Sequence, residues 1–414
     1  MKNRVVITGL GIVSPIGIGK IQFTESLKNG VNGIDKITLF DATDFPSKVG
    51  AEVKDFRPKD FMPEKEIKKL GRAAHLAIAA AQLAIEDAKI NLDDQTRSRC
   101  PVFIGTAVGG MDFAEENFYK IFRMGPSKIS AFAGVAVFCA SVSSAVSTDL
   151  GLHGPSYSFA NGCCSSTDAI GNVFNYLRNG FGDIALTGGA DACVTGGVLA
   201  AFCQMGVVTT KFNDKPRYAC KPFHKDRDGF ALGEGSWVLI LETLERAIKR
   251  KALIYAEVVG YSASCDSYHC SRPHPKGQFN IEAINNAFKD ANIVSNQIDY
   301  ISAYGNATKI NDPIETKVFK EIFGLKTKQI PCSSIKSMIG HPIGATGAAQ
   351  VLSSALFFSE NFISPTINLD YPDPECDLDY VPNKSRYFKG DYILINTLSF
   401  GGKNSCLVTK RFKS

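Results

Sequence analysis

The chain has 414 residues, 44% of them hydrophobic and 21% charged, with a formal net charge of +5. These values are ordinary for a globular protein of two or three domain-sized units, or of two halves that share one large core. The charge is too small to indicate nucleic-acid binding, although clustered Lys and Arg would suit an acidic partner. The 12 cysteines form no CxxC pair and no zinc-type spacing. We therefore expect no metal site and reduced thiols, as in the cytoplasm.

Near the N-terminus, RVVITGLGIV (4–13) is β-branched and predicts a strand that ends at glycines and Pro15. These breaks argue against a signal peptide. GLGIVS (9–14) lacks the third glycine of a dinucleotide fingerprint, so nucleotide binding is disfavoured. Residues 73–90 predict a helix, and CPVFIGTAVGG (100–110) predicts a buried strand that ends in a glycine turn.

The longest uncharged segment is AFAGVAVFCASVSSAVS (131–147). It is slightly short for a membrane span and rich in Ser, Ala and Gly, so we expect no membrane insertion. A buried helix in the core or at a subunit interface is the better interpretation.

Two adjacent cysteines lie in NGCCSST (161–167), between a predicted strand at 156–160 and a predicted helix at 166–180. A thiol in such a turn faces a helix N-terminus, whose free N–H groups and dipole favour a thiolate and lower its pKa. The same N–H groups could stabilise an oxyanion during acyl transfer. The alternative is a small buried cysteine in a tight turn, and position alone does not separate the two.

Further strands are predicted at 183–192, 235–243, 255–264, 298–307 and 392–402, with a helix at 280–293 between them. The alternation predicts an α/β fold with mainly parallel or mixed sheets. AIEDAKINLDDQ (84–95) is similar to AFKDANIVSNQ (287–297), and each leads into a strand that ends in a turn. This repeat suggests a duplicated α/β half.

Four segments together resemble one family. GPSYSFANGCCSSTDAIG (154–171), DRDGFALGEG (226–235), SIKSMIGHPIGATGAA (334–349) and NTLSFGGKNS (396–405) follow the order of motifs in β-ketoacyl-ACP synthases of the elongating type. With VVITGLGIVSPIG at the N-terminus, the resemblance runs from about residue 3 to 412. It implies a thiolase-like αβαβα sandwich of two similar halves, for which we expect the divisions 1–253 and 254–414.

The resemblance also implies the site residues. Cys163 corresponds to the acylated nucleophile, and Cys164 is a small neighbour. His341 corresponds to one of two catalytic histidines, with Lys336 five residues before it and Glu315 as the expected partner of that lysine. The other histidine is absent, because AYGNAT (303–308) places Tyr304 there.

A tyrosine hydroxyl donates one hydrogen bond but does not become a cation near neutral pH. Losing one aimed donor costs about 10²–10³ in rate. We therefore expect self-acylation to survive better than decarboxylative condensation. Further departures are Asn161-Gly162 in place of Thr-Ala, Ser399 for the first gate glycine and Lys403 for threonine. A serine in the gate is expected to stiffen the loop or hold it in another position. Neutral drift in a working synthase is the alternative.

The resemblance places substrate at Phe400, Thr308, Asn306, Val108, Gly401 and Asn404. It implies no bound cofactor, because the substrates are carried on the phosphopantetheine of an acyl carrier protein. KEIKKLGR (65–72) holds cations at helical spacing and coincides with the family's carrier-protein surface, although a solvated helix face would look the same. The docking candidates are Lys65, Lys68, Lys69, Arg72 and Lys128.

Three functional hypotheses follow. The first is a ketosynthase of a fatty-acid or polyketide pathway, with acyl transfer without condensation as a specialised form. The second is a chain-length-factor-like subunit that pairs with an active ketosynthase, which the retained Cys163, Lys336 and His341 disfavour. A thiolase-like enzyme using free coenzyme A is disfavoured by the basic run. Homodimers and heterodimers are both compatible with the resemblance.

Overall fold

The computed structural model describes residues 2–413 and contains one mixed sheet whose two halves have the same strand order. One half is ordered β1 (Val5–Ser14), β8 (Leu232–Thr243), β7 (Ile184–Ala192), β5 (Val102–Gly105) and β6 (Ser156–Phe159). The other is ordered β9 (Ala256–Cys265), β15 (Lys403–Lys410), β14 (Tyr392–Ser399), β10 (Tyr300–Ser302) and β11 (Cys332–Ser333). In each half the first three strands are antiparallel and the last three are parallel.

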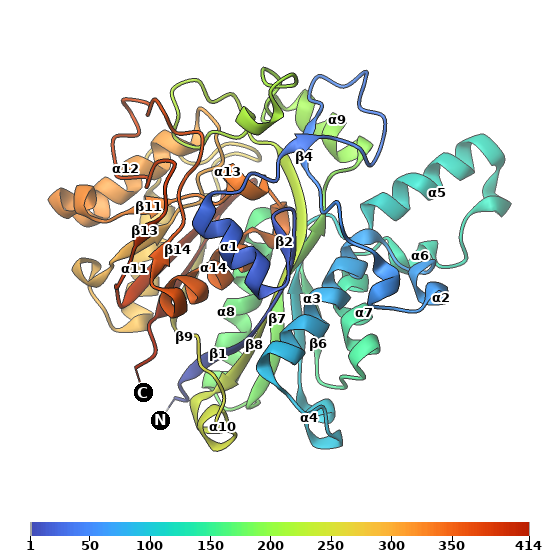
Figure 1. Ribbon diagram of the computed structural model, residues 1–414, viewed down its shortest axis with the longest axis horizontal. Helices are drawn as coiled ribbons and strands as arrows, with labels where there is room; N and C mark the ends of the chain where they lie inside the picture. The colour runs from blue at the N-terminus through green and yellow to red at the C-terminus, as the bar shows by residue number, and fades with distance from the viewer. Residues whose placement is uncertain (1, 414) are drawn as a thin grey trace.

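Helices lie between the two halves and also cover the outer faces of both (Figure 1). The central pair is α8 (Ser165–Arg178) and α14 (Thr346–Glu360), which contact each other. Residues 346–358 of α14 are all buried, as expected for an uncharged helix covered on every side. Outside lie α3 (Arg72–Ala88) on one half and α11 (Gln278–Ala291) with α12 (Asn311–Phe323) on the other. The result is the expected five-layered αβαβα arrangement.

The two halves also share a helix-on-strand contact. A Cβ at Gly9 of β1 would lie 2.5 Å from Ala84 O and 2.6 Å from Ala88 Cβ on α3. A Cβ at Gly260 of β9 would lie 2.4 Å from Ala287 O and 2.8 Å from Ala291 Cβ on α11. The sequence repeat at 84–95 and 287–297 therefore coincides with a repeated packing contact.

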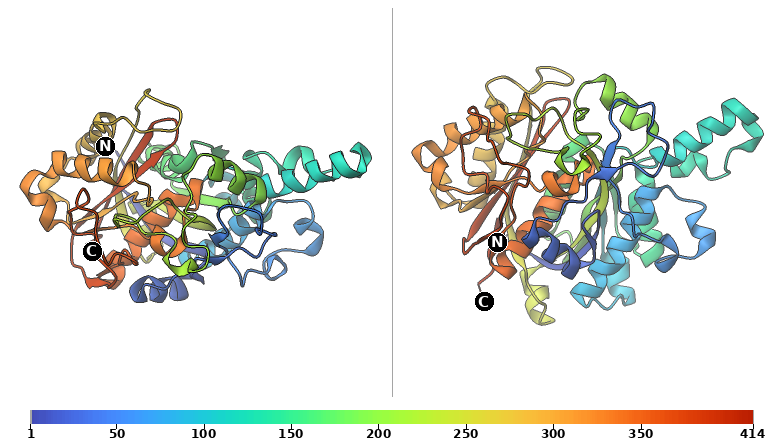
Figure 2. Two further views of the ribbon diagram at one scale, coloured as in Figure 1. Left: turned by 90° about the horizontal axis from the view of Figure 1, so that it is seen from above. Right: turned by 45° about the horizontal axis from the view of Figure 1, so that its top comes forward.

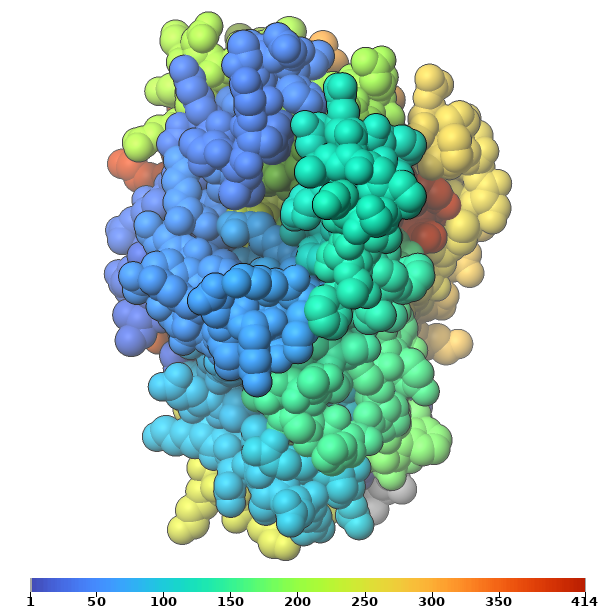
Figure 3. Space-filling view, turned by 90° about the vertical axis from the view of Figure 1, so that its right-hand side faces the viewer, coloured from blue at the N-terminus to red at the C-terminus, as the bar shows by residue number. Residues whose placement is uncertain are grey.

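The segment from 111 to 139 forms an arm that extends away from the sheet (Figures 1 and 2). It contains α5 (Met111–Met124) and α6 (Ala133–Ala136), and the chain then returns in α7 (Ala140–Leu150), which packs on α3, β5 and β6. The prediction of a single helix over 131–147 is therefore wrong, since the segment divides into two helices near residue 138. The second helix is in the core, as one form of the prediction required, whereas the first part is largely exposed and its place at a subunit interface stays a prediction. Phe122 is 82% exposed and Phe138 62%. In Figure 3 the arm and the 39–72 segments border a hollow, where a cavity of about 290 Å³ is lined by Phe40, Arg72, Asp112 and Glu115.

The other predicted elements are present, with β10 shorter than the predicted 298–307. The chain leaves the sheet after Ser302 because Gly305 and Ala307 adopt positive φ angles of 33° and 62° and turn the backbone. Within residues 2–413, no helix combines the length and the apolar character needed to cross a membrane.

Candidate active site

Cys163 lies in a one-turn helix, η3 (Gly162–Cys164), between β6 and α8. Gly162 has a φ of 63°, which permits the sharp turn from the strand into the helix. Both cysteines are buried. The Cys164 thiol faces the carbonyl oxygens of Thr397 and Lys403, each 3.5 Å away, as expected for a packed neighbour.

His341 is the nearest imidazole to the Cys163 thiol. It follows α13 (Lys336–Ile339), just before α14, so the two central helices bring the two side chains together from opposite halves. Cys163 Sγ lies 3.2 Å from His341 Nε2, and Thr346 Oγ1 lies 3.2 Å from His341 Nδ1. The rings of Phe230 and Tyr304 approach the imidazole edge-to-face at 4.9 and 5.6 Å. These contacts fix the orientation of the imidazole.

Tyr304 completes the cluster from the segment that follows β10. Its hydroxyl lies 3.0 Å from His341 Nε2, the same nitrogen that faces Cys163. Its backbone N–H donates to Glu315 Oε1 at 2.8 Å. The three side chains predicted from the sequence to form the reactive group therefore converge at one ring nitrogen.

Burial dominates the titration of this cluster. It raises the pKa of the Cys163 thiol above its usual value, and the Tyr304 hydroxyl, the Lys336 charge and the Ser399 hydroxyl offset only part of that effect. The expectation of a lowered thiol pKa is therefore wrong, because desolvation outweighs the stabilisation of the thiolate. Burial and the Lys336 charge hold the pKa of His341 well below its usual value. Near pH 7 the pair is a neutral thiol beside a neutral imidazole.

Lys336 and Glu315 are both buried, but their arrangement differs from the predicted ion pair. Lys336 Nζ donates to Tyr304 O at 2.5 Å and lies 4.3 Å from the centre of the Tyr304 ring. Glu315 instead accepts from the N–H groups of Tyr304 and Gly305 and from Asn396 Nδ2, each at 2.8 Å. Burial lowers the pKa of Lys336 to about 8. Both residues therefore act on the segment that carries Tyr304.

The gate segment is a tight hairpin turn between β14 and β15, in which Ser399 pairs with Lys403. Gly401 and Gly402 have φ angles of 82° and 69°, so the turn depends on both glycines. The neighbouring loop holds it, with Gly401 N–H donating to Cys270 O at 2.8 Å. Ser399 Oγ accepts a hydrogen bond from Cys163 N–H at 2.9 Å. The sequence marked Ser399 as a departure but did not reveal this contact.

A cavity of about 540 Å³, which we call the entrance, opens beside the gate, with Phe400 of the gate in its wall. Thr308 and Phe400 line it, as predicted, together with Asn311. Three exposed cations that the sequence analysis missed also line it: Lys211, Arg272 and Lys309. They come from three separate segments, so no charged run marks them in the sequence.

The remaining predicted substrate residues differ in position. Val108 packs against the apolar cluster that includes Cys163, Tyr304 and Leu398. Asn306 is buried and accepts from the Thr308 hydroxyl at 2.8 Å. Asn404 Nδ2 donates to Asp266 Oδ1 at 2.8 Å. Asn306 and Asn404 therefore brace the loops around the entrance.

The run at 65–72 is not one helix. Its cations divide between the short α2 (Glu64–Ile67), the link that follows it and the start of α3. Lys68 pairs with Glu64 and Lys69 with Glu66, whereas Lys65 and Lys128 are exposed. Arg72 is only 21% exposed and pairs with the buried Glu234 at 2.6 Å. The prediction that Arg72 contributes to a docking surface does not agree with this internal ion pair.

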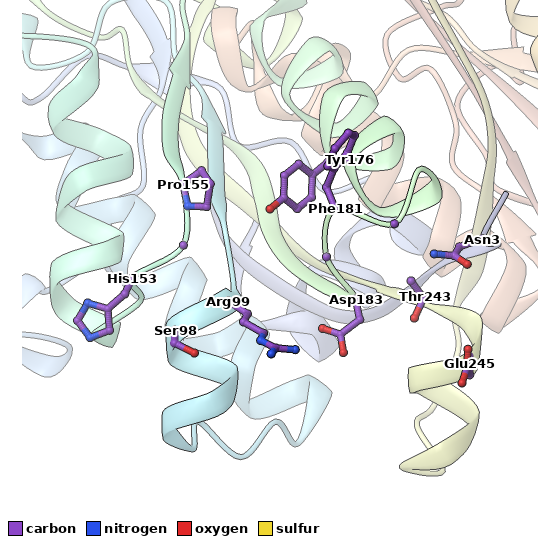
Figure 4. Close-up of a pocket in the computed structure, with 13 residues that line it drawn as sticks. Asn3, Ser98, Arg99, His153, Pro155, Tyr176, Phe181, Asp183, Thr243 and Glu245 are labelled. Atoms are coloured by element: carbon purple, nitrogen blue, oxygen red, sulfur yellow. The ribbon is translucent and has the colours of Figure 1, made fainter.

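A second cavity, of about 550 Å³, lies beside α4 (Asp94–Arg99), the end of α8 and α10 (Leu244–Lys249) (Figure 4). His153, Arg99, Asp183 and Glu245 line it, and none of the Cys163 cluster does. Its size alone therefore does not make it the reactive site. Among residues 2–413, no group of three or more His, Cys, Asp or Glu side chains is arranged to hold a metal ion.

Comparison with known proteins places this geometry among ketosynthases. Residues 2–247 match the N-terminal domain of beta-ketoacyl synthase, and residues 255–370 match its C-terminal domain. The chain is 40% identical over 412 residues to 3-oxoacyl-[acyl-carrier-protein] synthase 2 of Synechocystis sp., covering 100% of this chain and 99% of the relative. It is 39% identical over 412 residues to the protein of that name in Staphylococcus aureus strain N315, with the same coverage.

Two solved structures are also similar over the full length of both chains. One is the ishigamide ketosynthase/chain length factor, with a TM-score of 0.94 and 32% identity. The other is a type II polyketide synthase acyl-carrier protein in complex with its ketosynthase bound to the hexaketide, with a TM-score of 0.92 and 30% identity.

Proposed function

The chain belongs to the β-ketoacyl synthase family, and from this premise we propose that it is a ketosynthase that accepts an acyl group from acyl carrier protein on Cys163 and condenses it with malonyl-ACP. The contact of 3.2 Å between Cys163 Sγ and His341 Nε2 carries the proposal. A thiol beside a neutral imidazole, where a strand turns into a helix, suits acyl transfer. The full-length similarity to 3-oxoacyl-ACP synthases supports the same reaction.

The reaction has two steps at one sulfur. In the first, the Cys163 sulfur attacks the thioester carbon of acyl-ACP, the bond to the pantetheine sulfur breaks, and that sulfur leaves with a proton. In the second, malonyl-ACP loses CO₂, and the resulting carbanion attacks the acyl carbon on Cys163. The carbon–carbon bond forms, the bond to the Cys163 sulfur breaks, and the thiolate that leaves takes a proton from water to restore the thiol. Charge develops on the malonyl thioester oxygen, and the donors near Cys163 are the His341 ring and the Tyr304 hydroxyl.

An acyl carrier protein is the partner that delivers both substrates. The cavity lined by Thr308 and Phe400 would admit the phosphopantetheine arm, so we assign no bound cofactor to the protein itself. Lys211, Arg272 and Lys309 at the same cavity suit an acidic carrier. They are better placed for this role than the run at 65–72, which does not line the entrance.

A second ketosynthase-like chain is the other partner. Met111, Phe118, Tyr119, Phe122, Val135 and Phe138 on the arm are exposed apolar residues. A patch of this kind is typical of a subunit interface. The similarity to a ketosynthase/chain length factor supports dimer formation, with either an identical or a different subunit.

Tyr304 favours a second candidate function, acyl transfer without condensation. Its hydroxyl lies 3.0 Å from His341 Nε2 and approaches the nitrogen that also faces Cys163. Burial and the nearby Cys163 raise the pKa of Tyr304 well above its usual value, so the phenol stays neutral and contributes at most one donated hydrogen bond. Acylation of Cys163 depends less on a hydrogen-bond donor at position 304 than decarboxylation of malonyl-ACP does.

Two measurements on the purified full-length protein test these alternatives. Intact mass after incubation with octanoyl-ACP should show an acyl adduct that is absent in Cys163→Ala, and no adduct on the parent would exclude both candidates. Decarboxylation of malonyl-ACP should then rise by up to about 100-fold in Tyr304→His, which restores an imidazole donor. Tyr304→Phe is the matched control that removes only the hydroxyl. If the parent protein already decarboxylates malonyl-ACP as fast as Tyr304→His, Tyr304 does not limit that step. This result would favour full condensation over acyl transfer alone.

A further inference from the structure

The hydroxyl of Ser399 occupies the hydrogen-bonding position beside the nucleophile. Cys163 N–H donates to Ser399 Oγ at 2.9 Å, from the last residue of β14 across to the turn that carries the thiol. The Cys163 backbone is removed from water, since the residue is 2% exposed, whereas Ser399 is half-buried. A neutral hydroxyl is therefore the acceptor of this N–H group in the resting site.

The same N–H group has a different use when an acyl group arrives. As the Cys163 sulfur bonds to the thioester carbon, the carbonyl oxygen gains negative charge next to the nucleophile. An N–H donor of the nucleophilic residue itself is well placed to stabilise that oxygen. The oxyanion and Ser399 Oγ would therefore compete for one donor.

Gly162 is the residue that makes room for the Ser399 hydroxyl. A Cβ at position 162 would lie 2.3 Å from Ser399 Oγ, much closer than two such atoms can approach. In the pattern that this sequence resembles, alanine precedes the cysteine and glycine begins the gate. The departures at 162 and 399 therefore compensate for each other, since one removes a Cβ and the other adds a hydroxymethyl group in the same space.

The Cys163 thiol is covered in this structure, because the residue is only 2% exposed. The cavity at the gate, bordered by Tyr304, Leu398, Ser399 and Phe400, has a volume of about 20 Å³, which is less than a thioester needs. Ser399 adjoins the hairpin turn that contains Gly401 and Gly402, both with positive φ angles. Movement of that turn would withdraw the Ser399 hydroxyl and open the site in one step.

We propose that Ser399 is a positioning residue whose hydroxyl occupies the oxyanion position on Cys163 N–H in the resting enzyme, so that acylation requires the gate to withdraw it, and that Gly162 is the complementary residue that permits this arrangement. The inference rests on the proposed acylation of Cys163 and adds a gating step specific to this chain.

The test compares two reactions of the same thiol. Transfer from octanoyl-ACP passes through an oxyanion, whereas alkylation by iodoacetamide displaces iodide directly and forms none. We expect Ser399→Ala and Ser399→Gly to raise the rate of octanoyl transfer by about 3- to 10-fold, the value of one freed neutral hydrogen bond. The limiting alkylation rate at high pH, where the thiol is ionised, should stay unchanged. Ser267→Gly, on the neighbouring exposed loop, is the matched serine control.

A double-mutant cycle tests the role of Gly162. Gly162→Ala should slow octanoyl transfer, and adding Ser399→Gly should recover part of the loss. Equal increases in transfer and alkylation in the Ser399 variants would overturn the proposal, since they would indicate access alone. The proposal about Ser399 would also be overturned if octanoyl transfer were unchanged or slower in the Ser399 variants, or if the double variant showed no recovery. Either result would leave the proposed acylation of Cys163 intact. Failure of the parent and every variant to acylate would instead remove the proposed function as well.

Discussion

At the scale of single residues, the site depends on His341 Nε2, which faces both the Cys163 thiol and the Tyr304 hydroxyl. A neutral imidazole carries one proton, so Nε2 and the nitrogen facing Thr346 have opposite hydrogen-bonding roles. Either role of Nε2 is shared between two partners. With tyrosine at position 304, the site has one imidazole where the family pattern has two. Nε2 of that imidazole must interact with both Cys163 and Tyr304.

The charge of Lys336 influences how the thiol and the imidazole of this cluster titrate. Its charge lowers the pKa of Cys163 and also that of His341, and burial lowers its own pKa to about 8. We predict that Lys336→Met lowers the rate of Cys163 alkylation by iodoacetamide below about pH 8, where Lys336 carries its charge, and so moves the pH profile to higher pH, because the thiolate loses a stabilising cation. Tandem mass spectrometry separates modification of Cys163 from that of Cys164.

Lys320→Met serves as the control, since this lysine pairs with Asp377 on the surface and should leave the profile in place. A profile of Lys336→Met that stays at the parent position, or shifts to lower pH, would contradict the role given to the Lys336 charge.

At the scale of elements, the two halves share the same strand order and the same close contact between a helix and a strand. β1 packs on α3 through Gly9, and β9 packs on α11 through Gly260. The central helices begin on either side of the reactive cluster, with Cys163 preceding α8 and His341 preceding α14. The predicted division between 253 and 254 falls in the connection from α10 to β9 and stays a prediction.

The glycine contact predicts a loss of stability on substitution. Gly260→Ala would place a Cβ 2.4 Å from Ala287 O and should lower the free energy of unfolding by about 1–3 kcal/mol, as overpacking does. Thermal and urea denaturation measure this change. Gly134→Ala is a control in open space, because a Cβ there meets nothing within 4 Å and the φ of Gly134 is not positive. A Gly260→Ala protein no less stable than Gly134→Ala would show that α11 shifts away from β9 without cost.

At the scale of the whole molecule, the proposed function involves two surfaces, the entrance beside the gate and the exposed arm. The entrance brings together Lys211, Arg272 and Lys309 from segments far apart in the sequence. The arm stands clear of the sheet (Figure 1). Its apolar side chains, such as Phe122 and Phe138, are exposed. One surface suits an acidic carrier and the other a second subunit.

Charge reversal at the entrance tests the first surface. We predict that Lys211→Glu with Lys309→Glu lowers kcat/KM for octanoyl-ACP by about 10-fold at low ionic strength, and that added salt narrows the difference. Octanoyl-pantetheine, which carries no protein, should react equally with parent and variant. Lys384→Glu with Lys389→Glu matches the change in net charge at exposed residues outside the entrance. An equal loss in both double variants would indicate a general charge effect in place of docking at this entrance.

The sequence by itself determined the chemistry and the layered fold. Residue order carries the strand and helix periodicities, the repeat at 84–95 and 287–297, and motifs that identified Cys163, Tyr304 and His341. What it could not determine are contacts between segments distant along the chain. The tertiary structure decided that burial raises the thiol pKa, that Glu315 holds the Tyr304 backbone and not Lys336, and that Arg72 pairs internally with Glu234. It also brought the Ser399 hydroxyl to Cys163 N–H and gathered the entrance cations, because desolvation and hydrogen bonding depend on which groups meet in space.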